Sequence, residues 1–356
     1  MPSAAGKVDA KPVLAQKAGC GGGGAAKWAP PALPRAFDAV DSAQVSVKKV
    51  LLIYNPVSGK KLAKKLVDRF VVPQLTAAGV EVDARPTERP GHGAEMAQTL
   101  PLEGVDALVA IGGDGTLSEV VNGYQRREVP GICPLGFIPG GTGNSFCTDI
   151  GLPKANEQWV SEAVKRIVAG RTKKVDLQRI EGSAADGTAA PVAWSFNIVA
   201  WGLGTDANAA AEGMRWMGPA RYDVAILKEI MKFKRRTATI TVDDGAPMAL
   251  DPCMLACLQN NKHTGAGLCC APLAQLDDGL LDLWFGAPKS RAAAIEIQSQ
   301  IEGGGKHIYN ETVNYHRCRK VKLETPQPTR YMVDGDLRDY TPVQVEVVPG
   351  AISVFY

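Results

Sequence analysis

The sequence predicts an α/β protein with two domains, an N-terminal doubly wound α/β domain and a C-terminal, mainly β domain of the sandwich or barrel type. Three observations lead to this prediction. The chain has 356 residues, which is enough for about two domains of typical size. Its first half alternates short apolar runs with helical periods, and turns rich in glycine or proline follow the apolar runs. Its second half consists of short strand-like runs with frequent turns.

The first segment, residues 1–45, is rich in Ala, Gly, Pro and Lys and contains a run of four glycines at 21–24. Such a composition buries too little apolar surface to order the chain, so we expect a disordered leader. An organelle-targeting peptide is a second interpretation, because Asp9 is the only acid before Asp38, although arginine is scarce there.

The N-terminal α/β domain is predicted over residues 46–175. Continuous apolar runs predict buried strands, and apolar residues spaced by three or four predict helices. In chain order we expect a strand at 50–54, helix 60–75, strand 80–84, short helix 93–100, strand 107–111, helix 117–124 and strand 132–138. Parallel strands joined by helices bring their carboxyl ends to one edge of the sheet, where such domains bind ligands.

The C-terminal, mainly β domain is predicted over residues 176–356. One helix is expected at 222–233, and strands are expected at 194–199, 237–242, 254–258, 280–285, 321–324 and 344–348. No apolar run in the sequence reaches the roughly 18 residues that a membrane-spanning helix needs. Any membrane contact is therefore expected to be peripheral.

Charge and cysteine content exclude several classes of protein. The net charge of +3 is too small to indicate nucleic-acid binding. Eight cysteines in so long a chain form no dense disulfide framework, so reduced thiols and a cytoplasmic location are expected. A zinc site is the less favoured interpretation of the grouping Cys253, Cys257, Cys269 and Cys270, because paired CxxC spacing is absent. The oligomeric state is left open.

Three turns at the ends of predicted strands carry the candidate binding residues. Residues 55–60 follow the first strand, residues 112–116 (Gly-Gly-Asp-Gly-Thr) follow the third, and residues 139–144 (Pro-Gly-Gly-Thr-Gly-Asn) follow the fourth. Glycines allow backbone N–H groups to approach phosphate oxygens closely, and a helix N-terminus favours negative charge. We expect the three turns to face one crevice that holds a nucleotide triphosphate.

The carboxylate in the second turn needs a separate explanation. Asp114 would repel a neighbouring phosphate, so it is better explained as the acceptor of a proton from an attacking hydroxyl, or as a metal contact. A plain glycine-rich turn with an Asp cap is the alternative. Residues 55–60 are not a Walker A loop, because Tyr54 replaces the first glycine and Lys61 replaces Ser or Thr. A GxGxxG motif followed by an acid about twenty residues later is also absent, so a hydride-transferring dinucleotide site is weakly supported.

Four motifs in order resemble the diacylglycerol kinase and sphingosine kinase superfamily of lipid kinases. Three are the turns above, the second being extended by Glu119, Asn122 and Gly123, and the fourth is the Val-Asp-Gly-Asp sequence at 333–336. The resemblance covers residues 48–356. The stretch 200–222 is most similar to the plant-type sphingoid long-chain-base kinases.

The resemblance implies a kinase that uses ATP and Mg²⁺ to phosphorylate a primary hydroxyl of a membrane lipid, first of all a sphingoid long-chain base. Asp114 is the implied general base, Arg215 and Arg221 are implied phosphate ligands, and Asp336 is the implied metal contact. The implied nucleotide-binding positions are Asn55, Pro56, Ser58, Gly59, Lys60, Thr87, Gly112, Gly113, Gly115, Thr116, Glu119, Gly140, Gly141, Thr142, Gly143, Asn144, Arg215, Arg221, Asp334, Gly335 and Asp336. A diacylglycerol or ceramide kinase, or a soluble enzyme similar to NAD kinases, remains the alternative.

Two positions depart from the sphingosine kinase pattern. Those kinases hold the substrate amine with an acid two residues after the position of Asp206, but this chain has Asn208 there, and an amide cannot neutralise an ammonium group. Asp206 and Asn208 are the candidate lipid-substrate residues. Glu212 is a second possible acid, and a neutral head group such as that of diacylglycerol or ceramide would need none. Asp336 also replaces the usual Glu, which shortens its reach to a metal ion.

A short basic run follows the helix predicted at 222–233. It consists of Lys232, Lys234, Arg235 and Arg236, and it either faces solvent or contacts anionic lipid. The chain's histidines, His263 among them, lack the spacing of metal ligands.

Overall fold

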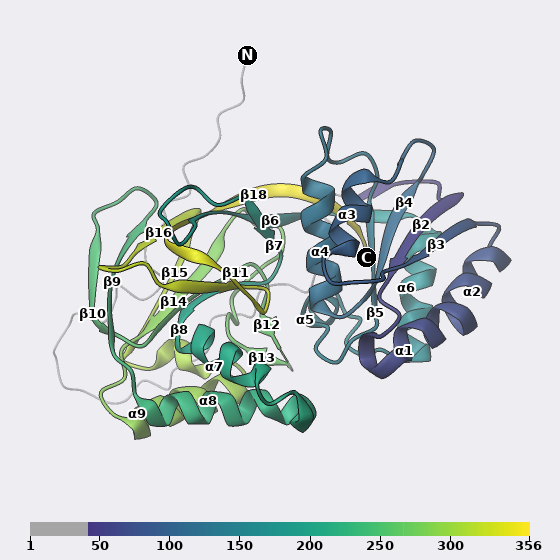
Figure 1. Ribbon diagram of the computed structural model, residues 1–356. Coiled ribbons are helices and arrows are strands. Elements are labelled where there is room, and N and C mark those ends of the chain that lie inside the picture. The colour runs from purple at the N-terminus through teal and green to yellow at the C-terminus, as the bar shows by residue number, and fades with distance from the viewer. Residues whose placement is uncertain (1–41, 266) are drawn as a thin grey trace, which may run out of the picture.

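The computed structural model describes residues 42–265 and 267–356 (Figure 1). The leader predicted at 1–45 lies almost wholly outside the described residues. The described chain forms two domains that share one long strand, β18 (Asp336–Phe355). The predicted fold class is confirmed, because a parallel α/β domain is followed by a mainly β domain.

The N-terminal domain is a parallel sheet with helices on both faces (Figure 1). Its strands, in the order β3-β2-β4-β5, are β3 (Glu81–Pro86), β2 (Lys49–Tyr54), β4 (Ala107–Gly112) and β5 (Leu135–Pro139). All residues of β4 and β5 are buried, as expected for apolar strands covered on both faces. The helical segments are α1 (Ser58–Leu66), the π-helical η1 (Val67–Val71), α2 (Val72–Ala77), α3 (His92–Thr99), α4 (Asp114–Gln125), α5 (Ser145–Asp149) and α6 (Glu157–Ala169).

The helices fall into two groups. The elements α2, η1 and α6 pack together, and α3 packs against α4 on the other side of the sheet (Figure 1). The helices predicted at 60–75, 93–100 and 117–124 correspond to α1–η1–α2, α3 and α4. Helix α4 begins earlier than predicted, at Asp114 itself.

The C-terminal domain is a sandwich of two sheets. One sheet has the order β15-β14-β11-β8-β17 and is formed by β15 (Val313–Cys318), β14 (Leu281–Gly286), β11 (Leu255–Gln259), β8 (Ile198–Gly202) and β17 (Arg330–Val333). The other has the order β10-β9-β16-β18-β6-β7 and comprises β10 (Met248–Cys253), β9 (Arg236–Val242), β16 (Lys320–Glu324), β18, β6 (Arg171–Ser183) and β7 (Ala193–Ser195). Strand β18 pairs with β17 as well and so joins the two sheets.

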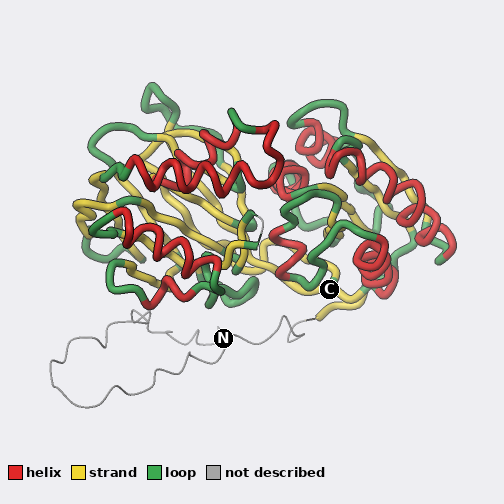
Figure 2. Tube along the Cα trace, turned by 90° about the horizontal axis from the view of Figure 1, so that it is seen from below, coloured by secondary structure: helices red, strands yellow, loops and turns green. Residues whose placement is uncertain are grey.

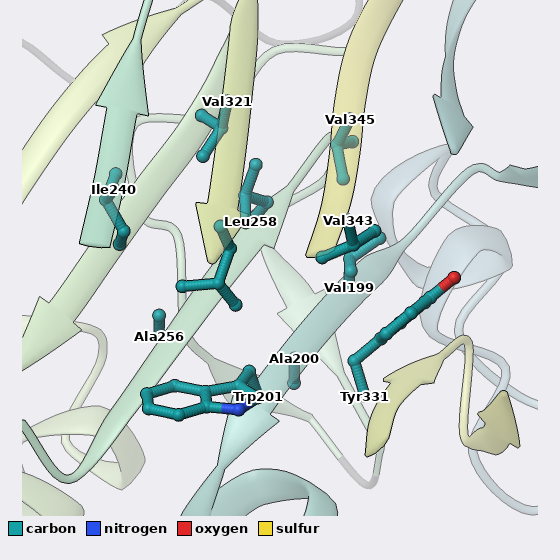
Figure 3. A pocket seen from close by; sticks show the side chains of 11 residues that line it. Val199, Ala200, Trp201, Ile240, Ala256, Leu258, Val321, Tyr331, Val343 and Val345 are labelled. Carbon is teal, nitrogen blue, oxygen red and sulfur yellow. The ribbon is translucent and has the colours of Figure 1, made fainter. Parts of the chain in front are cut away.

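The space between the two sheets is packed with apolar side chains (Figure 3). Trp201, Ile240, Leu258 and Val321 line a cavity there of about 10 Å³, which is at the lower limit of the space that a single water occupies. This cavity, as it stands in the described residues, is too small for a lipid chain.

Three helices cover the outer face of the first sheet: α7 (Leu203–Glu212), α8 (Arg221–Lys232) and α9 (Arg291–Glu302). The prediction of a single helix in this domain was therefore wrong. The shorter elements of the described chain are β1 (Ser42–Gln44), which pairs with β6, the 3₁₀ segments η2 (Arg215–Ala220) and η3 (Lys306–Tyr309), and the hairpin of β12 (His263–Thr264) and β13 (Leu268–Cys269). The strand predicted at 194–199 is broken into β7 and β8 at Phe196 and Asn197.

The end of β18 returns to the N-terminal domain. Ile352, Val354 and Phe355 belong to its apolar core, and Val354 pairs in parallel with Leu135 of β5. The two domains are thus joined by sheet hydrogen bonds as well as by the chain that connects them.

Candidate active site

The three turns predicted at strand ends lie against one another. A Cβ atom on Gly141 would lie 2.4 Å from the Cα of Gly113, and one on Gly59 would lie 2.7 Å from the carbonyl oxygen of Gly140. The backbone N–H of Gly140 also donates to the carbonyl of Gly112 over 2.8 Å. Only glycine permits contacts this close, so packing between the turns explains why the turns contain so many glycines.

Asp114 lies where these turns meet, as the first residue of α4. Its carboxylate accepts a hydrogen bond from the Ser145 hydroxyl over 3.1 Å and a weak one from the backbone N–H of Phe146 over 3.4 Å. Burial raises the pKa of Asp114 more than these bonds lower it, and the nearby Asp149 raises it further. None of the ion pairs between described residues includes Asp114, so no described cation neutralises its carboxylate.

The fourth motif comes from the other domain and lies close to this acid. Asp334 and Gly335 form a turn with positive φ angles of 49° and 96° between β17 and β18. The Oδ1 atom of Asp334 accepts bonds from the Ser195 hydroxyl (2.6 Å) and the Ile198 N–H (3.1 Å). Its Oδ2 atom has no hydrogen-bond partner among the described residues. Burial raises the pKa of Asp334 to about 6, and the negative charge of Asp114 contributes to the rise.

Asn208 supports this turn. Its side-chain amide donates to the carbonyl of Gly335 over 2.5 Å, which ties α7 to the Asp334 turn. The side chain is buried, with an exposed fraction of 8%. The side-chain amide of Asn208 thus makes a structural contact, and its predicted contact with the lipid stays a prediction.

Several other motif side chains support the turns from behind. Glu119 accepts hydrogen bonds from the N–H groups of Gly91 (2.8 Å) and Gly93 (3.0 Å) at the start of α3. Asn144 bonds to both the N–H and the carbonyl of Gly141, over 2.9 and 2.8 Å. Both side chains therefore hold backbone of the site, and the nucleotide contact that the sequence predicts for them stays a prediction.

Thr116, Thr87 and Asn122 lie in the same supporting layer. A Cβ on Gly112 would lie 2.5 Å from Thr116, which shows how closely that side chain covers the turn. Thr87 is buried, and its N–H donates to the carbonyl of Tyr54 over 2.8 Å. Asn122 bonds to the N–H and carbonyl of Trp194 over 2.9 and 2.7 Å, so it joins α4 to β7.

The remaining predicted positions keep some surface that a ligand could contact. Gly115, Thr142, Gly335 and Asp336 are exposed, and Asn55, Pro56, Ser58, Gly59, Gly113, Gly141 and Gly143 are partly exposed. The side chains of Lys60 and Arg215 lie outside the described part of the structure.

Arg221 and Asp206 have partners within the C-terminal domain. A terminal nitrogen of Arg221 donates to the Tyr222 hydroxyl over 2.9 Å and lies 3.9 Å from a carboxylate oxygen of Glu212. Asp206 pairs with Lys234 over 3.1 Å and with Arg236. In the described structure, Arg221 makes no hydrogen bond or ion pair with the three turns.

Residues that the sequence did not single out complete the site. Ser145 and Ser195 hold the carboxylates of Asp114 and Asp334, and Asp149 holds the β12–β13 hairpin beside them. Ser145 follows directly on the third turn, which was a usable signal. Ser195 lies 139 residues from its partner, and no sequence signal marks it.

Metal and thiol chemistry can be assessed from the same structure. The described cysteines are free thiols, and all but the partly exposed Cys269 are buried. In residues 42–265 and 267–356, no three His, Cys, Asp or Glu side chains gather closely enough to enclose a metal ion. This result includes the four cysteines considered for zinc. Helices long and apolar enough to cross a membrane are absent from the same residues.

The fold and the site together define a class of protein. Glycine turns at the carboxyl ends of parallel strands, at the start of a helix and around an unpaired acid, are suited to phosphoryl transfer. Residues 49–180 match the family described as the diacylglycerol kinase catalytic domain. Residues 197–356 match the YegS C-terminal NAD kinase beta sandwich-like domain.

Individual relatives agree with this class. A diacylglycerol kinase from Mycobacterium tuberculosis is 30% identical over 313 residues, which are 86% of this chain and 95% of that protein. Sphingosine kinase 1 of Arabidopsis thaliana is 27% identical over 322 residues, 78% of this chain and 64% of that protein. A crystal structure assigned as a diacylglycerol kinase from Bacillus anthracis str. Sterne aligns with a TM-score of 0.70 at 26% identity, covering 88% of this chain and 97% of that one.

The chain belongs to the diacylglycerol kinase family, in the broad sense that includes sphingosine kinases. It is an ATP-dependent lipid kinase. The family resemblance found in the sequence is confirmed.

Proposed function

We propose that the protein transfers the γ-phosphoryl group of ATP to the primary hydroxyl of a membrane lipid, with Asp114 as the general base. The observation that carries this proposal is the position of Asp114. It is the one carboxylate at the meeting point of the three glycine turns, it has no cationic partner among the described residues, and its pKa is raised. A raised pKa makes a carboxylate a better proton acceptor near neutral pH.

The turns would act by positioning and by charge. Backbone N–H groups of the glycine turns and the N-terminus of α4 offer donors and a favourable field to the triphosphate. Phosphoryl transfer depends mainly on such positioning and electrostatic stabilisation. The Asp114 carboxylate would take the hydroxyl proton, and the Ser145 hydroxyl, which donates to its Oδ2 atom, would hold it in place.

Magnesium fits the residues present. Asp114 and Asp334 both offer carboxylate oxygens, and the negative charge of Asp114 raises the pKa of Asp334, so a cation bound between the two would be stabilised by both. The unpartnered Oδ2 of Asp334 and the exposed Asp336 are the groups that would hold the ion. When bound, Mg²⁺ supplies charge neutralisation between phosphate oxygens. Magnesium sites in kinases typically combine one or two carboxylates with substrate phosphates, which agrees with the absence of a closed carboxylate cage in the described residues.

The acceptor that fits best is a neutral lipid alcohol, a diacylglycerol. Recognition of an ammonium group needs an unpaired carboxylate. Asp206 is already paired with Lys234 and Arg236, and Asn208 is bonded to Gly335. The mycobacterial relative named diacylglycerol kinase also aligns over 95% of its own length.

A sphingoid long-chain base is the second candidate. It is favoured by the similarity of residues 200–222 to the plant-type branch and by the Arabidopsis relative named sphingosine kinase. The two candidates differ in charge at the head group, so a direct comparison separates them.

The test combines a base variant with a substrate comparison. Asp114→Asn should bind ATP with nearly wild-type affinity and lose turnover by about 10² to 10⁴-fold. Asp68→Asn is the matched control, because Asp68 pairs only with the surface residue Lys64. Diacylglycerol, ceramide and sphingosine would be compared in mixed micelles by phosphate transfer. Wild-type turnover by Asp114→Asn would refute the base assignment, and a preference for sphingosine would refute the neutral acceptor.

A further inference from the structure

The outward face of α8 is apolar. Val224, Leu227 and Met231 have exposed fractions of 41%, 51% and 52%. Their spacing of three and four residues places them in one stripe along the helix. Trp216, in the preceding η2 segment, has an exposed fraction of 84%, and Ile295 on the neighbouring α9 is also exposed. We call these five residues the α8 face.

An exposed apolar stripe on a helix surface is unusual. A helix that packs on a sheet normally directs apolar residues inward and polar residues outward. Helix α8 does bury Ala225 and Ile230 against the domain, but it carries a second apolar stripe on the opposite side. Contiguous exposed apolar surface of this kind marks an interaction site.

Three exposed basic residues border the α8 face, which two exposed acids, Asp223 and Glu296, also adjoin. Lys228 lies one turn from Val224 on the same side of the helix and is exposed, as is Arg235 just after the helix. Arg291 connects α9 to α8 by donating to the carbonyl of Met231 over 2.8 Å. The ion pairs between described residues leave these three cations without an acidic partner, whereas Lys232 and Lys234 are paired with Glu229 and Asp206.

We propose that the α8 face docks on a lipid bilayer that contains anionic lipids. This inference rests on the proposed function, in which the acceptor is a membrane lipid. Apolar side chains enter the acyl boundary, and the surrounding cations attract the anionic head groups. A second copy of the chain is a poorer occupant, because a symmetric contact would bring Lys228 and its equivalent close together.

The position of this face suits delivery of a lipid to the site. Helices α7, α8 and α9 form one layer over the outer face of the β15-β14-β11-β8-β17 sheet, seen from below in Figure 2. Helix α7 in this layer carries Asn208, which holds the turn of Asp334. A bilayer against α8 therefore lies next to the helix that contacts the site.

The experiment measures binding of the full chain to vesicles, without ATP or acceptor lipid. Phosphatidylcholine vesicles are compared with vesicles that also contain phosphatidylserine. Leu227→Glu should weaken binding to the anionic vesicles by about tenfold or more, because a leucine side chain that would enter the acyl boundary is replaced by a charge. Lys228→Glu should weaken binding to anionic vesicles only, by about fivefold or more.

Matched controls come from the N-terminal domain. Val129→Glu changes a residue with an exposed fraction of 65%, and Lys65→Glu changes an exposed lysine of α1. Both should bind vesicles like the wild type, and Leu227→Glu should phosphorylate a water-soluble short-chain lipid at the wild-type rate. Two results would overturn the proposal. In the first, Leu227→Glu binds the anionic vesicles as tightly as the wild type does. In the second, Leu227→Glu changes a dimer into a monomer but keeps its binding to vesicles. Vesicle binding by a protein that transfers no phosphate would refute the proposed function alone.

A different set of contacts supports a second inference. Asp149, at the end of α5, accepts hydrogen bonds from the N–H groups of Lys262 (2.8 Å) and His263 (3.1 Å). The Nδ1 atom of His263 lies 2.5 Å from the other oxygen of the same carboxylate. Two residues later, the carbonyl oxygen of Gly265 lies 3.2 Å from the hydroxyl of Ser145, whose same oxygen lies 3.1 Å from Oδ2 of Asp114.

We infer that His263 and Asp149 are positioning residues for Asp114. They fix the β12–β13 hairpin to α5, and the hairpin fixes the Ser145 hydroxyl against the acid. The inference rests on the proposed role of Asp114 as the base. The hairpin touches the third turn at Gly143, but the contacts of Gly141 with Gly113 and of Gly59 with Gly140 do not involve it, so a shift of the hairpin should disturb Asp114 more than the packing between the turns.

The test separates turnover from nucleotide binding. His263→Ala should lower kcat by about tenfold or more and change the KM for ATP little, since small misplacements of a catalytic group are costly. His263→Asn retains a side-chain N–H for Asp149 and should recover much of the loss. His316→Ala is the control, because His316 is also partly buried but stacks on Phe285 in the β sandwich.

Two outcomes would overturn the positioning role. One is a wild-type kcat for His263→Ala. The other is equal loss in the alanine and asparagine variants together with a raised KM for ATP. If Asp114→Asn is inactive while His263→Ala is normal, the positioning role fails and the proposed function stands.

Discussion

Replacing Gly141 by alanine tests whether the packing between the second and third turns is needed for catalysis. The added Cβ would lie 2.4 Å from the Cα and 2.9 Å from the backbone nitrogen of Gly113. Carbon atoms pack without strain at about 3.5 Å or more, so the two turns must separate by about 1 Å. A misplacement of that size costs on the order of 10²-fold in rate. We therefore expect kcat to fall by about a hundredfold.

The assay is phosphate transfer to lipid in mixed micelles, with thermal unfolding measured in parallel. Gly286→Ala is the control, because its Cβ would meet side chains only at 3.8 and 3.9 Å. Gly115→Ala adds a second comparison: apart from its chain neighbours and the backbone of its own helix, no atom of the described residues lies within 4 Å of the added Cβ, so an increase in the KM for ATP would report a bound nucleotide. A wild-type kcat for Gly141→Ala with an unchanged melting temperature would refute the reasoning.

Three further predictions follow from individual contacts. Glu119→Gln should lower the free energy of unfolding by about 1–3 kcal/mol, because one of the two backbone N–H groups at the start of α3 loses its acceptor. A raised KM for ATP with an unchanged free energy of unfolding would contradict this prediction. Asn208→Asp should reduce activity on every lipid tested, because it places a carboxylate against the Gly335 carbonyl; a gain of activity on sphingosine would show that position 208 reads the head group instead. Activity of the wild type should fall as the pH drops through about 6, because Asp334 has a pKa of about 6 and is then protonated. Added Mg²⁺ should move this loss to lower pH. The measurement is kcat/KM against pH, and an acid limb at about pH 4 without added Mg²⁺ would contradict the assignment.

The parallel sheet and its turns were predictable from local sequence. Three apolar runs predicted buried strands and the alternating segment at 80–84 predicted a fourth strand, and the structure places all four in one parallel sheet, with β3 partly exposed at its edge. Since the carboxyl ends of parallel strands lie at one edge, the three glycine turns had to come together. The distances between Gly113 and Gly141 and between Gly59 and Gly140 show how closely they do.

The roles of the polar motif residues were less predictable. A polar side chain near a ligand site can contact the ligand or hold the backbone that does. Asn144 and Glu119 hold backbone, and Asn208 holds a carbonyl group 127 residues away. Such a partner is determined by tertiary structure, so no local pattern separates the two roles.

The helices α7 and α9 were missed for a different reason. Both are rich in alanine, which has the highest helix propensity but a weak apolar signal. The buried residues of α9, Ala294, Ile297 and Ile301, nevertheless have helical spacing. Attention to propensity as well as apolar period would have found this helix.

The relation between the two acids of the site follows from one strand. The turn of Asp334 directly precedes β18, which begins at Asp336 and ends in the core of the N-terminal domain at Phe355. Sheet hydrogen bonds to β6 and β5 hold this strand along much of its length. The carboxylates of Asp114 and Asp334 are therefore held close although they belong to different domains, and their repulsion is part of the folded structure before any ligand binds. A cation that entered with a nucleotide would relieve this repulsion, so under the proposed function the strand that joins the domains would also prepare the site for a charged substrate.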